Sequence, residues 1–127
     1  TSQPAHPIKL RSEEDLISNF AVHPIRKSGR NSFTGITIGR AADNDIIIPV
    51  RTVSNFHAWV SEEFGRFFCY DAGSSYGTGV NQILLRNGER HPLDPGVRVN
   101  LGDVSATFVD AAGLFSWLGA RLLLLRP

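Results

Sequence analysis

The chain has 127 residues, of which 20% are charged and 42% are hydrophobic, so it can bury the core of one soluble globular domain. Its formal net charge of +1 argues against a general nucleic-acid binder, and its single cysteine, Cys69, excludes an internal disulfide framework and a cysteine-based zinc site. The sequence shows neither a signal peptide nor an apolar run near the ~20 residues of a membrane span, which favours a cytoplasmic protein that does not enter a membrane.

Residues 1–20 are predicted to form an N-terminal extension with one short helix. Ser12 is a suitable N-cap, and the acidic residues after it favour the first turn of a helix from Glu13 to Asn19. The polar, glycine-containing segment from Arg26 to Ser32 separates two β-type runs, and we expect it to be a solvated loop.

Residues 21–110 are predicted to form an antiparallel β-sandwich. From Gly35 onward, short runs of β-branched and aromatic residues alternate with turn residues, which is typical of an all-β sandwich. Turns are expected at Asn87-Gly88 and Pro95-Gly96. The predicted strands are Gly35 to Arg40, Ile46 to Ile48, His57 to Ser61, Arg66 to Asp71, Gln82 to Leu85, Arg90 to Leu93, Arg98 to Leu101 and Ala106 to Val109.

Residues 111–127 form an apolar C-terminal segment that is predicted to be helical. Asp110 is a suitable cap for a helix from Ala111 to Leu125. One face of that helix would carry Leu114, Leu118, Leu122 and Leu125. We expect the helix to dock on the sandwich. Self-association through this segment is a second reading, and a β-strand from Arg121 to Leu125 remains an open alternative.

The segment from Ile38 to Asn81 concentrates small polar side chains and one arginine between its β-type runs. Hydroxyls, amides and a guanidinium donate hydrogen bonds and carry positive charge, which suits a phosphate group. In chain order the segment contains Gly39-Arg40, Asn44-Asp45-Ile46, Ser54-x-x-His57-Ala58 and Asp71-x-Gly73-Ser74-x-x-Gly77-Thr78-x-x-Asn81. These blocks, in this order, resemble the forkhead-associated (FHA) domain family.

The resemblance implies an FHA/SMAD-like β-sandwich with short terminal helices that binds phosphothreonine in partner proteins, after a Ser/Thr kinase has phosphorylated them. Arg40 leads the candidates, because a phosphothreonine carries about −1.5 to −2 charges and a guanidinium meets two of its oxygens at once. The implied phosphopeptide-binding residues are Arg40, Thr52, Ser54, Asn55, Ser75 and Tyr76. The implied loop-bracing residues are Gly39, His57, Thr78 and Asn81. The resemblance implies no cofactor, metal or nucleic-acid partner.

Three positions depart from the usual pattern of the family. Tyr76 replaces an asparagine whose amide would hold the peptide backbone, Gly79 replaces an aromatic residue, and Gln82 replaces a glycine. Ser75 keeps a hydroxyl where the family usually has threonine, so that phosphate contact can survive. The departures support a second hypothesis, in which the same fold is a phosphate-independent interaction or oligomerisation module that uses another face.

Two patterns in the sequence also occur in hydrolytic enzymes. Residues 73–77 match Gly-x-Ser-x-Gly, the nucleophile elbow of α/β-hydrolases, but that elbow needs a following helix, and here a β-type run follows. Ser54, His57 and Asp71 can be written as a triad, although only composition suggests it. We therefore predict no catalytic residues.

The order of the strands leaves the position of Arg40 open. In a simple meander, the loops at 49–56 and 72–79 leave the sheet at one end, whereas the turn after Arg40 lies at the other. Either the chain crosses between sheets near Ile46 or Arg40 reaches across. The family resemblance implies that the recognition loops gather at one end.

Overall fold

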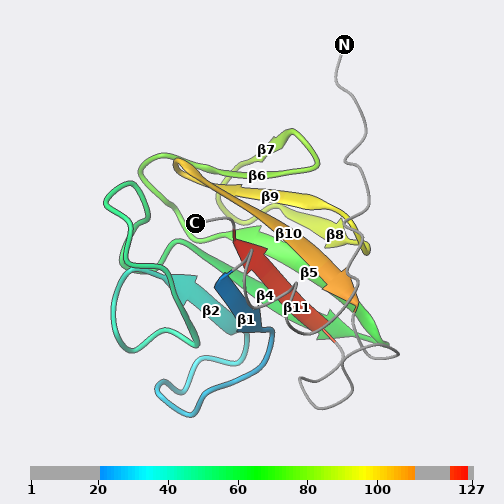
Figure 1. Ribbon diagram of the computed structural model, residues 1–127, viewed down its shortest axis with the longest axis horizontal. Helices are drawn as coiled ribbons and strands as arrows, with labels where there is room; N and C mark the ends of the chain where they lie inside the picture. Colours follow the sequence, from blue (N-terminus) through cyan, green and yellow to red (C-terminus); the bar gives the residue numbers. More distant parts are fainter. Residues whose placement is uncertain (1–20, 111–120, 126–127) are drawn as a thin grey trace.

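A computed structural model describes residues 21–110 and 121–125, which form two β-sheets packed face to face (Figure 1). The first sheet has six strands in the order β1 (Ala21–Pro24), β11 (Arg121–Leu125), β10 (Val104–Asp110), β9 (Arg98–Leu101), β6 (Thr78–Val80) and β7 (Ile83–Leu85). The second has five, in the order β3 (Ile46–Ile47), β2 (Ile36–Gly39), β4 (Ala58–Glu63), β5 (Arg66–Asp71) and β8 (Arg90–Leu93). The predicted all-β sandwich is confirmed. The helix predicted from Glu13 to Asn19 lies outside the described residues.

The strands follow the alternation in the sequence. Along β5, Phe67, Cys69 and Asp71 are buried, whereas Phe68 and Tyr70 lie on the outer face of the sheet. A period of two is expected because successive side chains of a strand point to opposite faces. The inward residues of both sheets meet in one hydrophobic core.

The C-terminal leucines form a strand, so the helix predicted through Leu125 is wrong for residues 121–125. β11 lies between β1 and β10 and pairs antiparallel with both. Its side chains from Leu122 to Leu125 are all buried. A strand covered on both faces reads as a continuous apolar run, which spacing alone cannot distinguish from a buried helix. The open alternative of a strand from Arg121 to Leu125 is confirmed, and residues 111–120 lie outside the described part of the chain.

A parallel pair of strands determines where the chain turns after β2. Ile38 pairs with Ile46 and Gly39 with Ile47, so β3 runs in the same direction as β2. The chain therefore leaves the end of β2 at Arg40, loops back over residues 40–45 and leaves β3 at the same end. Because β2 and β3 belong to the same sheet, the chain does not cross between sheets near Ile46, and Arg40 does not need to reach across; the short parallel connection removes the conflict of the simple meander.

Candidate functional site

Three loops meet at one end of the five-stranded sheet (Figure 1). Ile38 near the end of β2 pairs with Ala58 at the start of β4, and Ala58 pairs with Asp71 at the end of β5. Neighbouring antiparallel strands begin and end at a common edge. The register thus brings together the loops 40–45, 48–57 and 72–77, which we call the recognition loops.

Arg40 and Ser54 come from two of these loops and are joined through the backbone. The Arg40 amide donates a hydrogen bond to the Ser54 carbonyl oxygen at 2.9 Å. The Arg40 side chain donates through Nε to the Val53 carbonyl oxygen, also at 2.9 Å. This contact fixes the guanidinium by its Nε and leaves the Nη groups at its tip to face solvent or a ligand.

Ser54 is joined to the third loop by its side chain. Its hydroxyl oxygen accepts a hydrogen bond from the backbone amide of Ser75 at 3.0 Å. A serine hydroxyl has one donor and two acceptor sites, so this contact leaves the hydroxyl proton free to donate. The structure thus brings Arg40, Ser54 and Ser75 to one surface from three separate loops.

His57 lies fully buried beneath the loops and hydrogen-bonds two of them. Its Nδ1 accepts from the Ser54 amide at 3.0 Å, which places the ring proton on Nε2. Nε2 then donates to the Gly77 carbonyl oxygen at 2.8 Å. Burial lowers the pKa of His57 below its ordinary value and outweighs the opposite effects of the Gly77 carbonyl and of Asp71. A neutral imidazole therefore holds the loops at 54 and 77 together.

Asp71 organises the loop that follows β5. One carboxylate oxygen accepts from the amides of Gly73 and Ser74, and the other accepts from the hydroxyls of Ser74 (2.6 Å) and Thr78 (2.7 Å). Thr78 is fully buried, and Asp71 nearly so. A short loop that satisfies a buried carboxylate in this way has little freedom to rearrange. Asp71 appeared in the sequence motif but was not predicted as a brace.

Gly39 allows the first two recognition loops to touch. A Cβ atom at this position would lie 2.2 Å from the Asn55 carbonyl oxygen. That oxygen accepts from the Asn44 side-chain amide at 2.6 Å and from the Ala41 backbone amide at 3.2 Å. Asn44 appears in the sequence motif without a predicted role, and its buried side-chain amide connects two loops.

The other residues predicted to bind the phosphopeptide lie on the outer surface of the recognition loops. Asn55, Ser75 and Tyr76 are exposed, and Tyr76 is 69% exposed. The hydroxyl oxygen of Thr52 accepts from the Asp103 amide at 2.9 Å, which ties this loop to the turn between β9 and β10.

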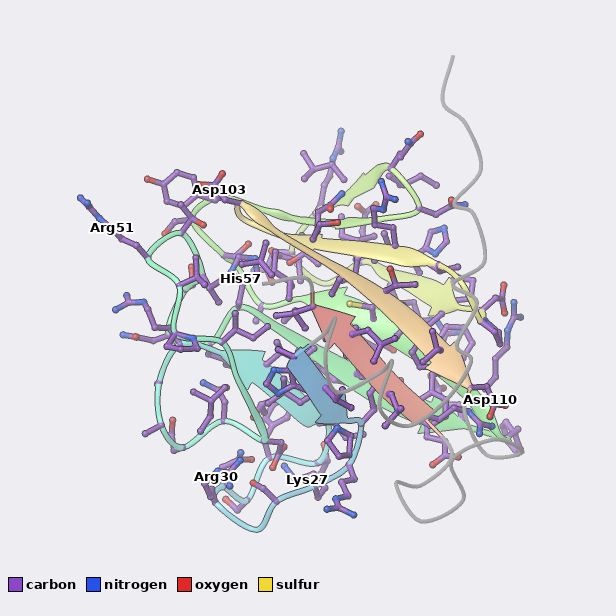
Figure 2. All side chains as sticks on the ribbon, in the orientation of Figure 1. Lys27, Arg30, Arg51, His57, Asp103 and Asp110 are labelled. Atoms are coloured by element: carbon purple, nitrogen blue, oxygen red, sulfur yellow. The ribbon has the colours of Figure 1, made fainter. Side chains whose placement is uncertain are left out.

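Arg51, which the sequence reasoning did not single out, projects away from the body of the domain at the tip of its loop (Figure 2). Neither Arg40 nor Arg51 forms an ion pair with an acidic residue within the described ranges. Two cationic side chains therefore stand at this end of the sandwich. The only signal for Arg51 in the sequence is its position in the loop before Ser54.

Asn81 lies apart from this group. With Gln82 it forms the two-residue turn between β6 and β7, and both have left-handed backbones, with φ of 52° and 66°. Turns of this kind match the twist of a β-hairpin. The Asn81 amide donates to the Arg98 carbonyl oxygen at 2.9 Å, so in this structure it supports the six-stranded sheet.

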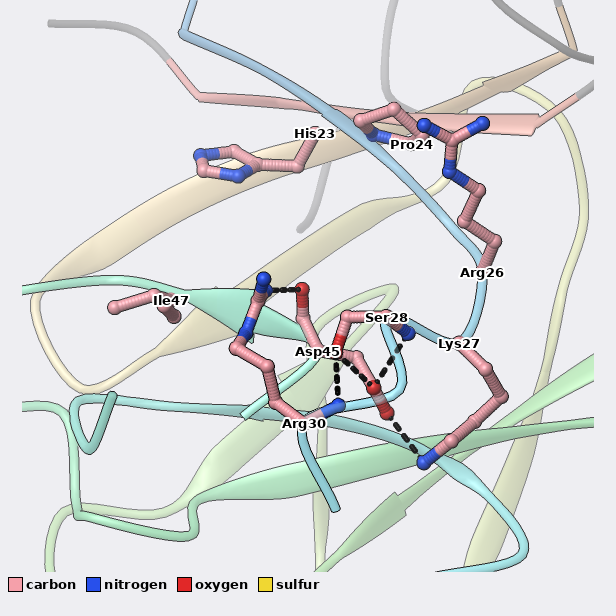
Figure 3. Close-up of a pocket in the computed structure, with 8 residues that line it drawn as sticks. All are labelled: His23, Pro24, Arg26, Lys27, Ser28, Arg30, Asp45 and Ile47. Atoms are coloured by element: carbon pink, nitrogen blue, oxygen red, sulfur yellow. Dashed lines mark hydrogen bonds and ion pairs between the residues drawn. The ribbon is translucent and has the colours of Figure 1, made fainter. Parts of the chain in front are cut away.

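A polar hollow of about 580 Å³ lies between the edge strands β1 and β3 (Figure 3). The Asp45 carboxylate there accepts from Lys27 Nζ at 2.7 Å, from the Ser28 amide and hydroxyl, and from the Thr37 amide. Arg30 donates to the carbonyl oxygens of Asn44 and Asp45. Burial alone would raise the pKa of Asp45, but these hydrogen bonds outweigh it and hold the pKa far below its usual range. The segment from Arg26 to Ser32, predicted as a solvated loop, lies outside the strands and is largely exposed, and these hydrogen bonds fasten it to the loop that carries Asn44.

The enzyme-like patterns do not assemble into the geometry they would need. The loop at 73–77 leads into strand β6 and not into a helix. His57 binds the backbone amide of Ser54, and the Asp71 carboxylate is occupied by its own loop.

Over residues 21–110 and 121–125, no three His, Cys, Asp or Glu side chains are placed to hold a metal ion. The same residues contain no helix that could span a bilayer.

Comparison with known proteins gives concordant matches. Residues 36–102, more than half of the chain, match the model of the FHA domain. Protein FraH of Nostoc sp. is 44% identical over 50 residues, which is 39% of this chain and 17% of that protein. The FHA-2 domain of a Mycobacterium tuberculosis ABC transporter is 30% identical, with a TM-score of 0.57 over 83% of this chain and 85% of that chain.

The M. tuberculosis protein EmbR, in complex with a low-affinity phosphopeptide, is 29% identical with a TM-score of 0.55, over 71% of this chain and 24% of that chain. The chain therefore spans only a small part of FraH and of EmbR. The family model, the fold and the recognition loops agree, and we conclude that this chain belongs to the FHA domain family.

Proposed function

We propose that this domain binds protein segments that carry phosphothreonine and thereby reads phosphorylation by a Ser/Thr kinase. The observation that carries the proposal is the convergence of Arg40, Ser54 and Ser75 at one surface. The proposed role is non-catalytic. Asn55 assists at the phosphate, and Thr52 and Tyr76 lie beside the neighbouring peptide residues.

The chemistry of the loops suits a dianionic phosphate. The Arg40 guanidinium supplies charge and paired donors, and the Ser54 hydroxyl supplies a neutral donor. No acidic side chain within the described residues neutralises Arg40. A phosphate would therefore gain attraction there without first displacing a competing carboxylate.

The buried hydrogen bonds beneath the recognition loops favour binding of a phosphopeptide. His57, Asp71 and Asn44 are buried and hold the loop backbones by hydrogen bonds. Loops that are ordered before the ligand arrives lose less conformational freedom on binding. The complex of the related EmbR with a phosphopeptide is consistent with this use of the fold. We expect a micromolar dissociation constant, which corresponds to about −8 kcal/mol.

The decisive experiment is titration with a degenerate peptide library in three forms, which carry phosphothreonine, phosphoserine or unmodified threonine. We expect binding only to the phosphothreonine form, and loss of binding in Arg40→Ala. Arg66→Ala is the matched control, because it removes the same charge at the end of β5 away from the recognition loops. The Arg66 side chain is exposed, and its nitrogen lies 3.7 Å from the Asp94 carboxylate, which is a loose ion pair. Equal binding of the phosphorylated and unmodified forms would contradict the proposal, as would full binding by Arg40→Ala.

The alternative is a phosphate-independent interaction module. Of its suggested surface, the C-terminal leucines, Leu122 to Leu125 are buried in β11, whereas Leu114 and Leu118 lie outside the described residues. Binding of the unmodified peptides would revive this alternative and would direct attention to another face of the domain.

A further inference from the structure

The polar hollow between β1 and β3 concentrates positive charge (Figure 3). Three basic side chains, Arg26, Lys27 and Arg30, line it together with a single carboxylate, that of Asp45. The hollow therefore has an excess of two positive charges, whereas the whole chain has a net charge of only +1. Its volume of about 580 Å³ lies in the usual range of ligand-binding cavities. Charge and space of this kind favour an anion.

Lys27 and Asp45 compensate each other and belong to the fold. The Asp45 side chain is fully buried, and one of its oxygens accepts from Lys27 Nζ at 2.7 Å. The same Nζ also donates to the Asn31 side chain and to the Gly35 carbonyl oxygen, so its three protons are all bound. A ligand in the hollow would therefore meet the two arginines and not this pair.

Arg30 is held in place without being neutralised. Its Nε and Nη2 donate to the carbonyl oxygens of Asn44 and Asp45, which carry no net charge. Among the described residues, Nη1 has no partner and no carboxylate pairs with this guanidinium. Figure 3 shows the Arg30 side chain extending toward the ring of His23 on β1. One edge of the guanidinium thus remains available to a ligand.

Arg26 supplies a second uncompensated charge. It is exposed and forms no ion pair within residues 21–110 and 121–125, not even with Glu62, with which it borders a neighbouring hollow. The backbone between the two arginines turns sharply, since Gly29 has a left-handed φ of 86° and the Ser28 hydroxyl accepts from the Arg30 amide at 3.1 Å. This turn directs Arg26 and Arg30 to the same hollow.

We propose that the hollow binds a small organic phosphate, with its phosphate group between the guanidinium groups of Arg26 and Arg30. Such a group carries about −1.5 to −2 charges, which matches the excess of positive charge. Guanidinium groups meet phosphate oxygens with paired hydrogen bonds. Pro24 and Ile47 add apolar wall, and because about 150 Å³ already holds a benzene ring, the hollow has room for an organic group. None of its lining residues is among those proposed to bind the phosphopeptide.

The test is a titration of the Arg40→Ala protein with phenyl phosphate, followed by the amide resonances in nuclear magnetic resonance spectra. The Arg40→Ala background removes the guanidinium of the recognition loops, so that those loops do not compete for the probe. We expect a dissociation constant below about 1 mM, with the largest changes at the amides of Ser28 and Arg30. Phenol, which lacks the phosphate, should not bind.

Arg26→Ala in the same background should weaken binding at least tenfold, and Arg26→Glu should abolish it, because each removes a charged donor. Both variants should fold, since Arg26 is exposed. Arg98→Ala is the matched control, because Arg98 is an exposed arginine on β9, three strands away from β1, and it should leave the affinity unchanged.

Four results would overturn the inference: a dissociation constant above about 1 mM, equal binding of phenol, unchanged affinity in Arg26→Ala, or amide changes confined to the recognition loops. The titration contains no phosphothreonine peptide, so each of these results would leave the proposed function intact. Conversely, a failure of the unaltered protein to bind phosphothreonine would leave this inference standing.

Discussion

The backbone amide of Ser75 donates a hydrogen bond to the hydroxyl oxygen of Ser54 at 3.0 Å, across 21 positions of sequence. This bond orients the Ser54 oxygen, since the amide occupies one of its acceptor sites, and leaves the hydroxyl proton for a ligand. One small side chain thus joins two of the recognition loops and keeps a hydrogen-bond donor for the ligand that we propose.

Replacement of Ser54 by alanine should weaken phosphothreonine binding at least tenfold. The variant loses a donor to a charged group, which is worth about 1.5–3 kcal/mol, and also loses the contact with Ser75. Isothermal titration with a phosphothreonine peptide measures the change. Ser105→Ala removes a hydroxyl from an exposed position on β10 and should leave the affinity unchanged. An unaltered dissociation constant in Ser54→Ala would show that this hydroxyl does not touch the phosphate.

Gly39→Ala should destabilise the domain, whereas Gly79→Ala should not. Neither glycine has a left-handed backbone, so the two differ in available space alone. The added methyl group at position 39 would lie 2.2 Å from the Asn55 carbonyl oxygen, and at position 79 it would lie 3.6 Å from its nearest atom. Overpacking of this kind costs about 1–3 kcal/mol. Urea unfolding of both variants provides the comparison, and equal midpoints would contradict the prediction.

Asp45→Asn should lower the free energy of unfolding by about 2–4 kcal/mol, because an amide nitrogen would face the donors of Lys27, Ser28 and Thr37 that now bind the carboxylate. Asp94→Asn is the control, since Asp94 is exposed and its pair with Arg66 spans 3.7 Å. Chemical denaturation should show a large decrease in the free energy of unfolding for Asp45→Asn and a negligible change for Asp94→Asn. A similar small change in both would mean that Asp45 contributes little to the fold.

The domain should lose stability as the pH falls below about 6.5, the pKa of histidine in an unfolded chain. Burial lowers the pKa of His57 in the folded state, so between the folded and unfolded pKa values the unfolded chain binds the proton more tightly. The stabilising contribution is therefore present above the unfolded value and is lost as the pH decreases. His23, whose pKa is also lowered by burial, acts in the same direction.

Urea unfolding at several pH values between about 7.5 and 5.5 checks this expectation. His57→Asn should be less stable than the unaltered protein and should show a smaller slope of stability against pH, with the remaining slope due to His23. A slope that is identical in His57→Asn would assign the effect to other groups. Below about pH 4, protonation of Asp45 should add a second decline, because its folded pKa lies below the unfolded value.

The sequence predicted the β-sandwich and the loop motif, but it did not predict the order in which the strands pair within the sheets. Alternating runs such as Arg66 to Asp71 predicted strands because one face of each is buried. No pattern in residues 36–47 predicts that β2 pairs in parallel with the two-residue strand β3, because this pairing depends on which edge of the sheet is free. For the same reason the leucines of β11 were assigned to a helix, as their neighbours β1 and β10 are not visible in the segment itself.

The residues of the candidate site were predictable from the sequence only where they belong to a motif. Arg40, Ser54 and Ser75 could be named from the order of the blocks, and the structure brings their loops together. The sequence could not predict the hydrogen bond from the Asn44 side-chain amide to the Asn55 carbonyl oxygen, nor the open space beside Gly79 on the outer face of the six-stranded sheet. Each depends on how closely two backbones approach one another. Asn81, named from the motif, supports a hairpin outside the recognition loops.

The pairing of β1 with β11 has a mechanical consequence. Ala21 and Leu125 are direct partners in the register, so the chain enters and leaves the described fold at adjacent points. Tension applied between those two points would pull β1 away from β11 at that end, so the backbone hydrogen bonds between them would open in order from Ala21 towards Pro24.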